Sequence, residues 1–285
     1  MIIDRSTTAL VVDSTADLPD NLASDPNLTL VPLTVFFGEE SYLDWVELSP
    51  ELFYQKLAAA PKLPTTSQPA PGVWTELYGR LLERYARVYS VHLSGDFSGT
   101  HQTAAMIAGQ FDGVKVIDSR LATGGIALLV DRLMERIDRG TPEEEFDAYI
   151  DYFHANKTFL FLPTTLDYLY KGGRIGRASH LVGTILNVKP VLEIKDGVAD
   201  VYKKVRGLRQ AVETMRGGLL ERTEPGSDVY ANLSHGLNLP VMEHLRDLLA
   251  EITDRRIHLR PPSIVGSVIG TYIGPGAVGI GFIQE

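Results

Sequence analysis

The sequence of 285 residues contains no cysteine. This absence excludes disulfides, thiolate metal sites and cysteine nucleophiles, and it is compatible with a reducing compartment. No apolar run approaches the roughly 20 residues that a membrane-spanning helix needs, and Asp4 stands where a signal peptide carries basic residues. We therefore expect a cytoplasmic protein without an integral membrane segment.

The chain also lacks an excess of basic residues. It has 27 lysines and arginines against 36 aspartates and glutamates, which gives a formal net charge of −9. This balance argues against general affinity for nucleic acid or for anionic lipid surfaces. A local basic patch can still dock a partner, so a transient contact with a membrane or with another protein stays open.

The short motifs of several enzyme classes are missing as well. The sequence has no H-E-x-x-H pair of a zinc hydrolase, no G-x-S-x-G turn of a serine hydrolase and no G-x-x-x-x-G-K-[ST] loop for ATP. Residues 274–279 match the dinucleotide pattern G-x-G-x-x-G, but a strand-like run follows them where that motif needs a helix. We expect no metal, no cofactor and no catalytic residue.

The chain does contain a regular alternation of short apolar runs and longer stretches. Runs rich in Val, Ile and aromatic residues occur at residues 9–13, 88–93, 114–117 and 158–162, and the stretches between them are long enough for helices. This alternation predicts a parallel sheet in a Rossmann-like α/β domain over residues 1–162. Ser49-Pro50 and Thr141-Pro142 are typical of helix starts, and the second is followed by a capping-box Glu.

The second part of the chain has a different pattern. Asp196-Gly197 separates two apolar runs and predicts a hairpin, and therefore antiparallel pairing. Further strands are expected at residues 228–233, 264–269 and 277–283, and helices at residues 208–220 and 240–252. We therefore predict a second α/β domain with a mixed sheet over residues 163–285.

Five short polar segments are spread over the chain, and several of them lie where an apolar run ends. They are residues 13–19 (DSTADLP), 65–69 (TTSQP), 94–100 (SGDFSGT), 171–175 (KGGRI) and 274–276 (GPG). The ends of strands are where an α/β protein assembles a ligand site. Each segment taken alone also fits a structural role, as a cap, a loop, a helix start or a solvated turn. The residues by themselves leave both interpretations open.

In their number and order these segments resemble the DegV family, the fatty-acid-binding proteins whose members include the B-type subunits of bacterial fatty-acid kinase. The resemblance extends over nearly the whole chain and includes Ser41-Tyr42-Leu43-Asp44 and Asp118-Ser119. It implies two α/β domains with the ligand between them. The ligand implied is a long-chain fatty acid whose acyl chain enters an apolar tunnel.

The resemblance also implies which residues hold the carboxylate of the fatty acid. Thr66 matches the threonine that hydrogen-bonds the carboxylate in the family. Gly95 stands where the family commonly has a second serine, so it can offer only its backbone amide. Tyr272 replaces the family's histidine, and its hydroxyl can still donate a hydrogen bond. The full set of candidate positions is Thr66, Ser67, Ser94, Gly95, Ser98 and Tyr272.

Two basic positions, Arg174 and Arg206, are implied to face the headgroup entrance or a phosphate-bearing partner.

The resemblance favours a non-catalytic carrier that presents its fatty acid to a separate ATP-dependent kinase subunit, which makes acyl phosphate for phospholipid metabolism. Two alternatives stay open. One is a lipid store or transporter without a kinase partner. The other is a substrate-binding subunit related to that of dihydroxyacetone kinase, which shares the fold and holds its substrate covalently on a histidine.

Overall fold

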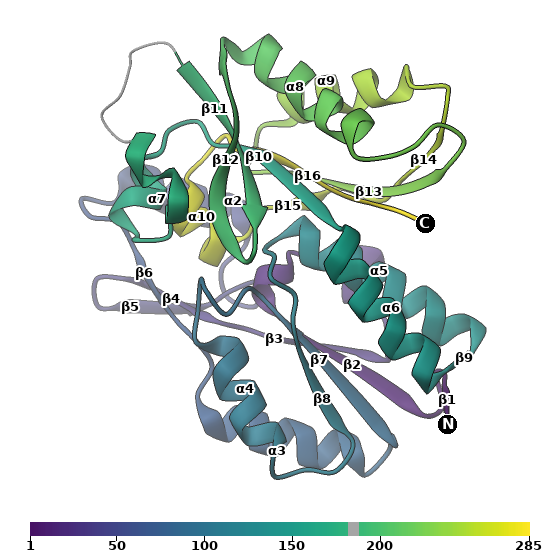
Figure 1. Ribbon diagram of the computed structural model, residues 1–285. Coiled ribbons are helices and arrows are strands. Elements are labelled where there is room, and N and C mark those ends of the chain that lie inside the picture. Colours follow the sequence, from purple (N-terminus) through teal and green to yellow (C-terminus); the bar gives the residue numbers. More distant parts are fainter. Residues whose placement is uncertain (182–187) are drawn as a thin grey trace.

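Two large β-sheets, one above the other in Figure 1, organise the chain. The structure is a computed structural model that describes residues 1–181 and 188–285. The lower sheet is parallel, and its strands in spatial order are β3 (Leu28–Val31), β2 (Thr8–Asp13), β7 (Arg87–His92) and β8 (Val114–Asp118). Strand β2 is buried along its whole length, as expected for a parallel strand that is covered on both faces. The predicted parallel sheet is therefore confirmed for the first three apolar runs.

The upper sheet is mixed, as predicted. Its strands in spatial order are β12 (Val198–Arg206), β11 (Val188–Lys195), β10 (Thr158–Leu162), β16 (Val278–Gln284), β13 (Asp228–His235) and β14 (Arg256–Leu259), and β15 (Ser263–Ile264) also pairs with β13. Strands β14 and β15 run parallel to β13, and the other pairs are antiparallel. The predicted hairpin is confirmed, because Asp196 and Gly197 adopt positive φ angles of 51° and 85° between β11 and β12.

A small antiparallel sheet extends from the parallel sheet. Its strands in order are β5 (Glu40–Leu43), β4 (Thr34–Phe37) and β6 (Thr65–Ser67), while β1 (Ile2–Ile3) pairs separately with β9 (Thr141–Pro142). Residues 65–67 form strand β6, whereas their residue types taken alone also fit a loop or a helix start. In the sheet, Thr66 pairs with Val35 of β4, a long-range contact that the residue types did not reveal.

Helices cover both sheets. They are α1 (Asp20–Ala23), α2 (Pro50–Ala59), α3 (Pro71–Leu82), α4 (Thr100–Ala108), α5 (Gly124–Arg139), α6 (Glu143–Asn156), α7 (Asp167–Lys171), α8 (Leu208–Glu221), α9 (Leu239–Ala250) and α10 (Ser267–Ile273), with short 3-10 helices η1 (Ser14–Ala16) and η2 (Gly176–Leu181). In Figure 1, α8 and α9 lie over the upper sheet, and α3 and α4 lie against the lower sheet. Over residues 1–181 and 188–285, no helix combines the length and apolarity needed to cross a membrane.

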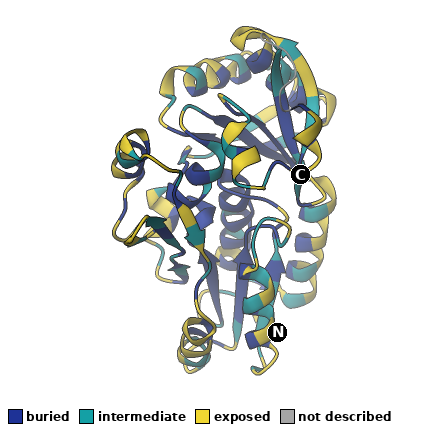
Figure 2. Cartoon of the chain, turned by 90° about the vertical axis from the view of Figure 1, so that its left-hand side faces the viewer, coloured by how far each residue is buried: buried dark blue, intermediate teal, exposed yellow. Residues whose placement is uncertain are grey.

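Helix α5 joins the two sheets into one core. It contacts β7 of the lower sheet and β13 and β16 of the upper sheet, and Figure 2 shows buried residues running through the middle of the molecule. Val12 of β2, Leu129 of α5 and Phe161 of β10 belong to the same apolar cluster. Glycine is needed where α5 begins, because a Cβ on Gly124 would lie 2.1 Å from Asn232 Oδ1.

Three predictions about local structure are wrong. Residues 158–162 form a strand, but β10 pairs with β11 and β16 of the mixed sheet, since a short apolar run fits either kind of buried sheet. Residues 264–269 were expected to be one strand, whereas β15 ends at Ile264 and α10 follows. Helix α6 begins near the expected place, yet the Thr141 hydroxyl donates to Arg136 O and does not cap that helix.

Candidate ligand-binding site

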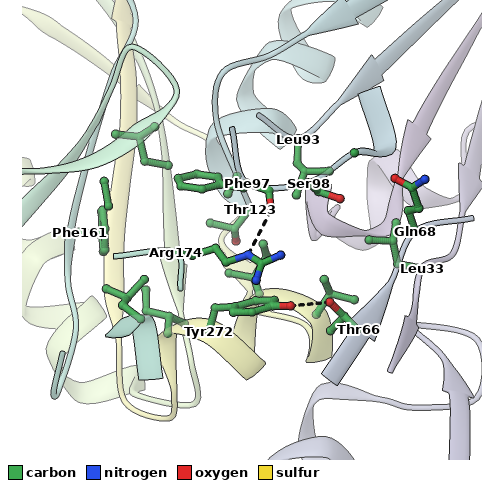
Figure 3. Close-up of a pocket in the computed structure, with 18 of the residues that line it drawn as sticks. Leu33, Thr66, Gln68, Leu93, Phe97, Ser98, Thr123, Phe161, Arg174 and Tyr272 are labelled. Atoms are coloured by element: carbon green, nitrogen blue, oxygen red, sulfur yellow. Dashed lines mark hydrogen bonds between the residues drawn. The ribbon is translucent and has the colours of Figure 1, made fainter. Parts of the chain in front are cut away.

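A cavity of about 350 Å³ lies between the lower and the upper sheet (Figure 3). This volume is within the range of small-molecule sites. The polar lining consists of Thr66, Ser67, Gln68, Ser98, Gly99, Thr123, Arg174 and Tyr272. The apolar lining includes Leu93, Phe97, Phe159, Phe161, Leu169, Ile194, Ala199 and Ile273. The site therefore combines a large apolar surface with a small number of polar groups.

A hydrogen bond between two hydroxyls joins the two halves of the chain at the cavity. Thr66 of β6 and Tyr272 of α10 approach within 2.7 Å, between Thr66 Oγ1 and the Tyr272 hydroxyl. Side chains alternate along a strand, and Thr66 is half-buried between two exposed neighbours on β6. A hydroxyl has one proton and two lone pairs. When one hydroxyl donates to the other, the second proton is available to an acceptor in the cavity.

Arg174 places a cation beside this hydroxyl pair. Its guanidinium Cζ lies 4.7 Å from the centroid of the Tyr272 ring. Backbone carbonyls fix its position, because Nε donates to Phe97 O at 3.2 Å and Nη1 donates to Gly172 O at 2.7 Å. Within residues 1–181 and 188–285, no carboxylate forms an ion pair with Arg174. A cation held without an acidic partner at a cavity wall can bind an anion.

The N-terminus of α4 adds neutral polar groups to the lining. The Ser98 hydroxyl and the Thr100 hydroxyl lie 2.9 Å apart, and Gln68 Nε2 donates to Thr103 Oγ1 at 2.8 Å. Gly99 lets Gln68 approach closely, because a Cβ on Gly99 would lie 2.6 Å from Gln68 Oε1. A helix N-terminus favours negative charge. This side of the cavity is therefore suited to a carboxylate or a phosphate.

The structure brings together five of the residues that the sequence predicted for the site or its entrance, and it keeps three apart from the cavity. Thr66, Ser67, Ser98, Arg174 and Tyr272 all line the cavity.

The other three candidates have different surroundings. The Ser94 hydroxyl is fully buried and donates to Gly197 O of the β11–β12 hairpin at 2.7 Å. The Gly95 amide donates to Asp118 Oδ1 at 3.2 Å. Arg206 is exposed at the end of β12 that is far from the hairpin turn.

Sequence reasoning did not predict Gln68 and Thr123 as lining residues. Gln68 directly follows the run of hydroxyl residues on β6, so its position in the sequence could have identified it as a lining residue. Thr123 gave no such signal, because it enters the cavity through an unusual backbone conformation, with a φ of 47°, at the start of α5. Phe159 and Phe161 were expected in the other sheet and instead form part of the apolar lining.

A second hollow adjoins the cavity. Arg174 and Tyr272 line both spaces, and Thr65 and Lys171 line the second hollow, where both are exposed. Arg174 and Tyr272 therefore separate the apolar cavity from a basic surface region.

One buried cluster has the residue types of a serine-hydrolase triad but not its accessibility. His92 Nδ1 lies 3.0 Å from Asp13 Oδ2, and His92 Nε2 lies 2.8 Å from Ser90 Oγ. All three side chains are fully buried, and Tyr78 donates to Ser90. A nucleophile must reach its substrate, so this cluster stabilises the ends of β2 and β7. Within the described residues, no group of three or more His, Cys, Asp or Glu side chains is placed to hold a metal ion.

The family model described as "Uncharacterised protein, DegV family" matches residues 7–285. A DegV domain-containing protein from Halalkalibacterium halodurans is 36% identical over 281 residues, which cover 97% of this chain and 98% of that protein.

Two solved structures are also similar to this chain. A DegV family protein from Thermus thermophilus, described for its fatty-acid binding, has a TM-score of 0.93 and 32% identity, with 98% of this chain and 100% of that chain covered. DegV from Bacillus subtilis, described as a fatty acid binding protein, has a TM-score of 0.86 and 29% identity, with 98% and 100% covered.

Proposed function

This chain belongs to the DegV family, and on that premise we propose that it is a non-catalytic carrier of a long-chain fatty acid. It binds the acid in the cavity and presents the carboxylate to a separate ATP-dependent kinase subunit. That subunit transfers the terminal phosphoryl group of ATP to a carboxylate oxygen, which yields an acyl phosphate and ADP. The carrier works in the cytoplasm, needs no cofactor and contacts membranes only transiently.

The observation that carries this proposal is Arg174, which has no acidic partner among the described residues, beside the Thr66–Tyr272 hydroxyl pair. Together these groups offer a carboxylate one charge-assisted contact and at least one neutral hydrogen bond. The similar proteins from Thermus thermophilus and Bacillus subtilis are described as binding fatty acids. Their fold and this polar group together support a carboxylate as the headgroup of the ligand.

The apolar lining supports a long acyl chain. Phe159, Phe161 and Ile194 present only hydrocarbon to the cavity. Burial of each methylene contributes about 0.8 kcal/mol, so a chain of many methylenes adds more to affinity than the headgroup contacts do. Short-chain acids are therefore expected to bind weakly.

The basic hollow supports presentation to a kinase. It adjoins the cavity at Arg174 and Tyr272, and Lys171 adds a second cation to its lining. A phosphoryl group that approaches from this side would meet positive charge next to the carboxylate. Arg206 lies apart from the hollow; its side chain is exposed and forms no ion pair within the described residues, and it is a further cation that we assign to the partner.

The dihydroxyacetone-kinase alternative has less support. Among the described residues that line the cavity there is no histidine that could hold a substrate covalently. A lipid store or transporter differs from the kinase carrier only in its partner, so a reaction with a partner has to separate these two functions.

A reconstituted reaction tests the proposal. Purified protein is mixed with oleate, ATP and the kinase subunit from the same cell, and ADP and acyl phosphate are measured. We expect ADP only when protein, oleate and kinase are all present. Tight oleate binding without ADP formation would favour the store or transporter, and no oleate binding would contradict both.

A further inference from the structure

Two carboxylates from the first half of the chain hold the start of α10. Asp17 Oδ1 accepts hydrogen bonds from the Gly266 amide at 3.0 Å and from Trp45 Nε1 at 3.1 Å. Asp44 Oδ1 accepts from the amide of Ser267 at 3.1 Å and also from the Ser267 hydroxyl. Because Gly266 and Ser267 are consecutive residues, the two carboxylates lie close together.

This pair of carboxylates is buried without a counter-charge. Both side chains belong to residues with no exposed surface, and no lysine, arginine or histidine within residues 1–181 and 188–285 forms an ion pair with either. Oδ2 of Asp17 and Oδ2 of Asp44 have no hydrogen-bond partner in the same residues. The hydroxyl of Thr123 faces Asp17, and the Ser14 side chain and the Val268 amide face Asp44, without making hydrogen bonds to these Oδ2 atoms. Two buried charges with free oxygens favour the uptake of a proton.

The directions of the pKa shifts agree with the geometry. Burial raises the pKa of the Asp44 carboxyl from its ordinary value of 3.8 to about 6, against the hydrogen bonds from Ser267 that lower it. Burial and then the charge of Asp44 raise the pKa of Asp17 well above its ordinary range. Among the described residues, Tyr54 also faces the pair. Burial and the two carboxylates raise its pKa, and its hydroxyl donates to Val265 O.

The pair is linked to the cavity through two elements. Helix α10, which it holds, carries Val268 and Tyr272 in the lining, and Thr123 lines the cavity as well. A change in how α10 packs against the first half of the chain therefore changes the wall that surrounds the ligand.

We propose that Asp17 and Asp44 form a proton-binding site that controls how firmly α10 is held, and through α10 how long the cavity retains its ligand. The part of this proposal that concerns the ligand rests on the proposed function. With both carboxyls protonated, no buried charge remains and α10 stays docked. When a proton leaves as the pH rises, a buried charge without a counter-charge is left at the start of α10, so α10 is held less firmly and the ligand leaves faster.

The sign of the effect on stability follows from the raised pKa. The folded protein binds the proton more tightly than the unfolded chain does, so stability is highest at low pH and falls as the pH rises towards 6. Unfolding equilibria of wild type and Asp44→Asn are measured between pH 4.5 and 8. In the window up to pH 6, we expect the unfolding constant of wild type, relative to that of Asp44→Asn, to rise by up to tenfold per pH unit. Parallel profiles would overturn the proposal.

Ligand release is the second measurement, with cis-parinaric acid as the probe. We expect the release rate of wild type to rise severalfold from pH 5 to pH 8, relative to that of Asp44→Asn. Asp20→Asn, an exposed acid on α1, is the control and should follow wild type. Equal pH dependence of release in wild type and Asp44→Asn would overturn the link to the ligand.

Two further measurements keep the proton-binding proposal testable if fatty-acid binding fails or if the variant does not fold. If wild type binds no fatty acid, the proposed function fails, and the unfolding profiles still decide whether the pair binds a proton. If Asp44→Asn does not fold, calorimetry of wild type in buffers of different ionisation enthalpy replaces it. At pH 5 we expect unfolding to release about two protons more than ordinary carboxyls account for, because both carboxyls are protonated in the folded protein, and no such release would overturn the proposal.

Discussion

The two walls of the cavity differ in chemistry, and the difference assigns a separate task to each. The wall from the first half of the chain carries the hydroxyl and amide groups of Thr66, Gln68 and Ser98, whereas the wall from the mixed sheet is built from Phe159, Phe161 and similar apolar residues. Apolar surface supplies affinity, and a small number of polar groups fix the orientation of a ligand. The mixed-sheet wall should therefore determine how tightly an acyl chain binds. The polar wall should determine the orientation of the ligand in the cavity.

A charge on the mixed-sheet wall should have the largest effect. Ile194→Asp places a carboxylate against the acyl chain, and removing that charge from water costs several kcal/mol. We expect the affinity for oleate to fall by at least about 100-fold, measured by titration calorimetry. Ile194 is half-buried on β11, so the fold should tolerate the change.

Val198→Asp is the matched control for this variant. Val198 is also half-buried, in the same hairpin, but it pairs with Lys195 and so points to the opposite face from Ile194. Unchanged oleate affinity is expected. Equal losses in both variants would mean that the hairpin, and not the cavity wall, had been damaged.

Arg174→Gln should have the next largest effect. The guanidinium lines the cavity, and a hydrogen bond to a charged group contributes about 1.5–3 kcal/mol. Oleate should bind about 10- to 150-fold more weakly, while an uncharged fatty alcohol should bind as it does to wild type. Arg206→Gln is the control, with normal oleate binding and slower ADP formation with the kinase subunit. Normal binding of oleate by Arg174→Gln would mean that Arg174 contacts only the kinase subunit and not the fatty acid.

Thr66→Val should lower affinity somewhat less. The substitution keeps the shape of the side chain and leaves a buried polar group one hydrogen bond short, at a cost of about 1–3 kcal/mol. Oleate affinity should fall by about 5- to 150-fold. Thr75→Val, which removes an exposed hydroxyl on α3, should bind like wild type. If Thr66→Val also binds like wild type, the polar wall does not hold the carboxylate.

Tyr272→Phe should have the smallest effect. It removes the hydroxyl that bonds to Thr66 but keeps the ring under Arg174. The loss of one neutral hydrogen bond amounts to about 0.5–1.5 kcal/mol, so affinity should fall by about 2- to 10-fold. A larger loss than in Thr66→Val would mean that the Tyr272 hydroxyl, and not Thr66, makes the main hydrogen bond to the carboxylate.

The polar wall was more accessible to sequence reasoning than the apolar wall. Thr66, Ser67 and Ser98 lie in short segments whose residue types and order carried a family resemblance. Phe159 and Phe161 lie in an apolar run that fits either sheet, and only the pairing of β10 with β16 reveals where they point. Periodicity identifies strands, but it does not identify their partners.

Contacts between distant parts of the chain account for further features that the sequence did not show. Helix α10 was expected to be part of a strand, and the carboxylates that hold its start come from residues more than 200 positions earlier. Ser94 has a hydroxyl suited to the headgroup, yet Gly197 O takes its hydrogen bond. No local pattern shows that a residue 103 positions away competes for that proton.

The most direct test of the account is the identity of what the cavity holds. Protein purified without added lipid is denatured, extracted and examined by mass spectrometry, with Ile194→Asp prepared in parallel as the negative control. We predict about one long-chain fatty acid per wild-type chain and far less in the variant. No fatty acid in wild type, together with no uptake of added oleate by the lipid-free protein, would contradict the account.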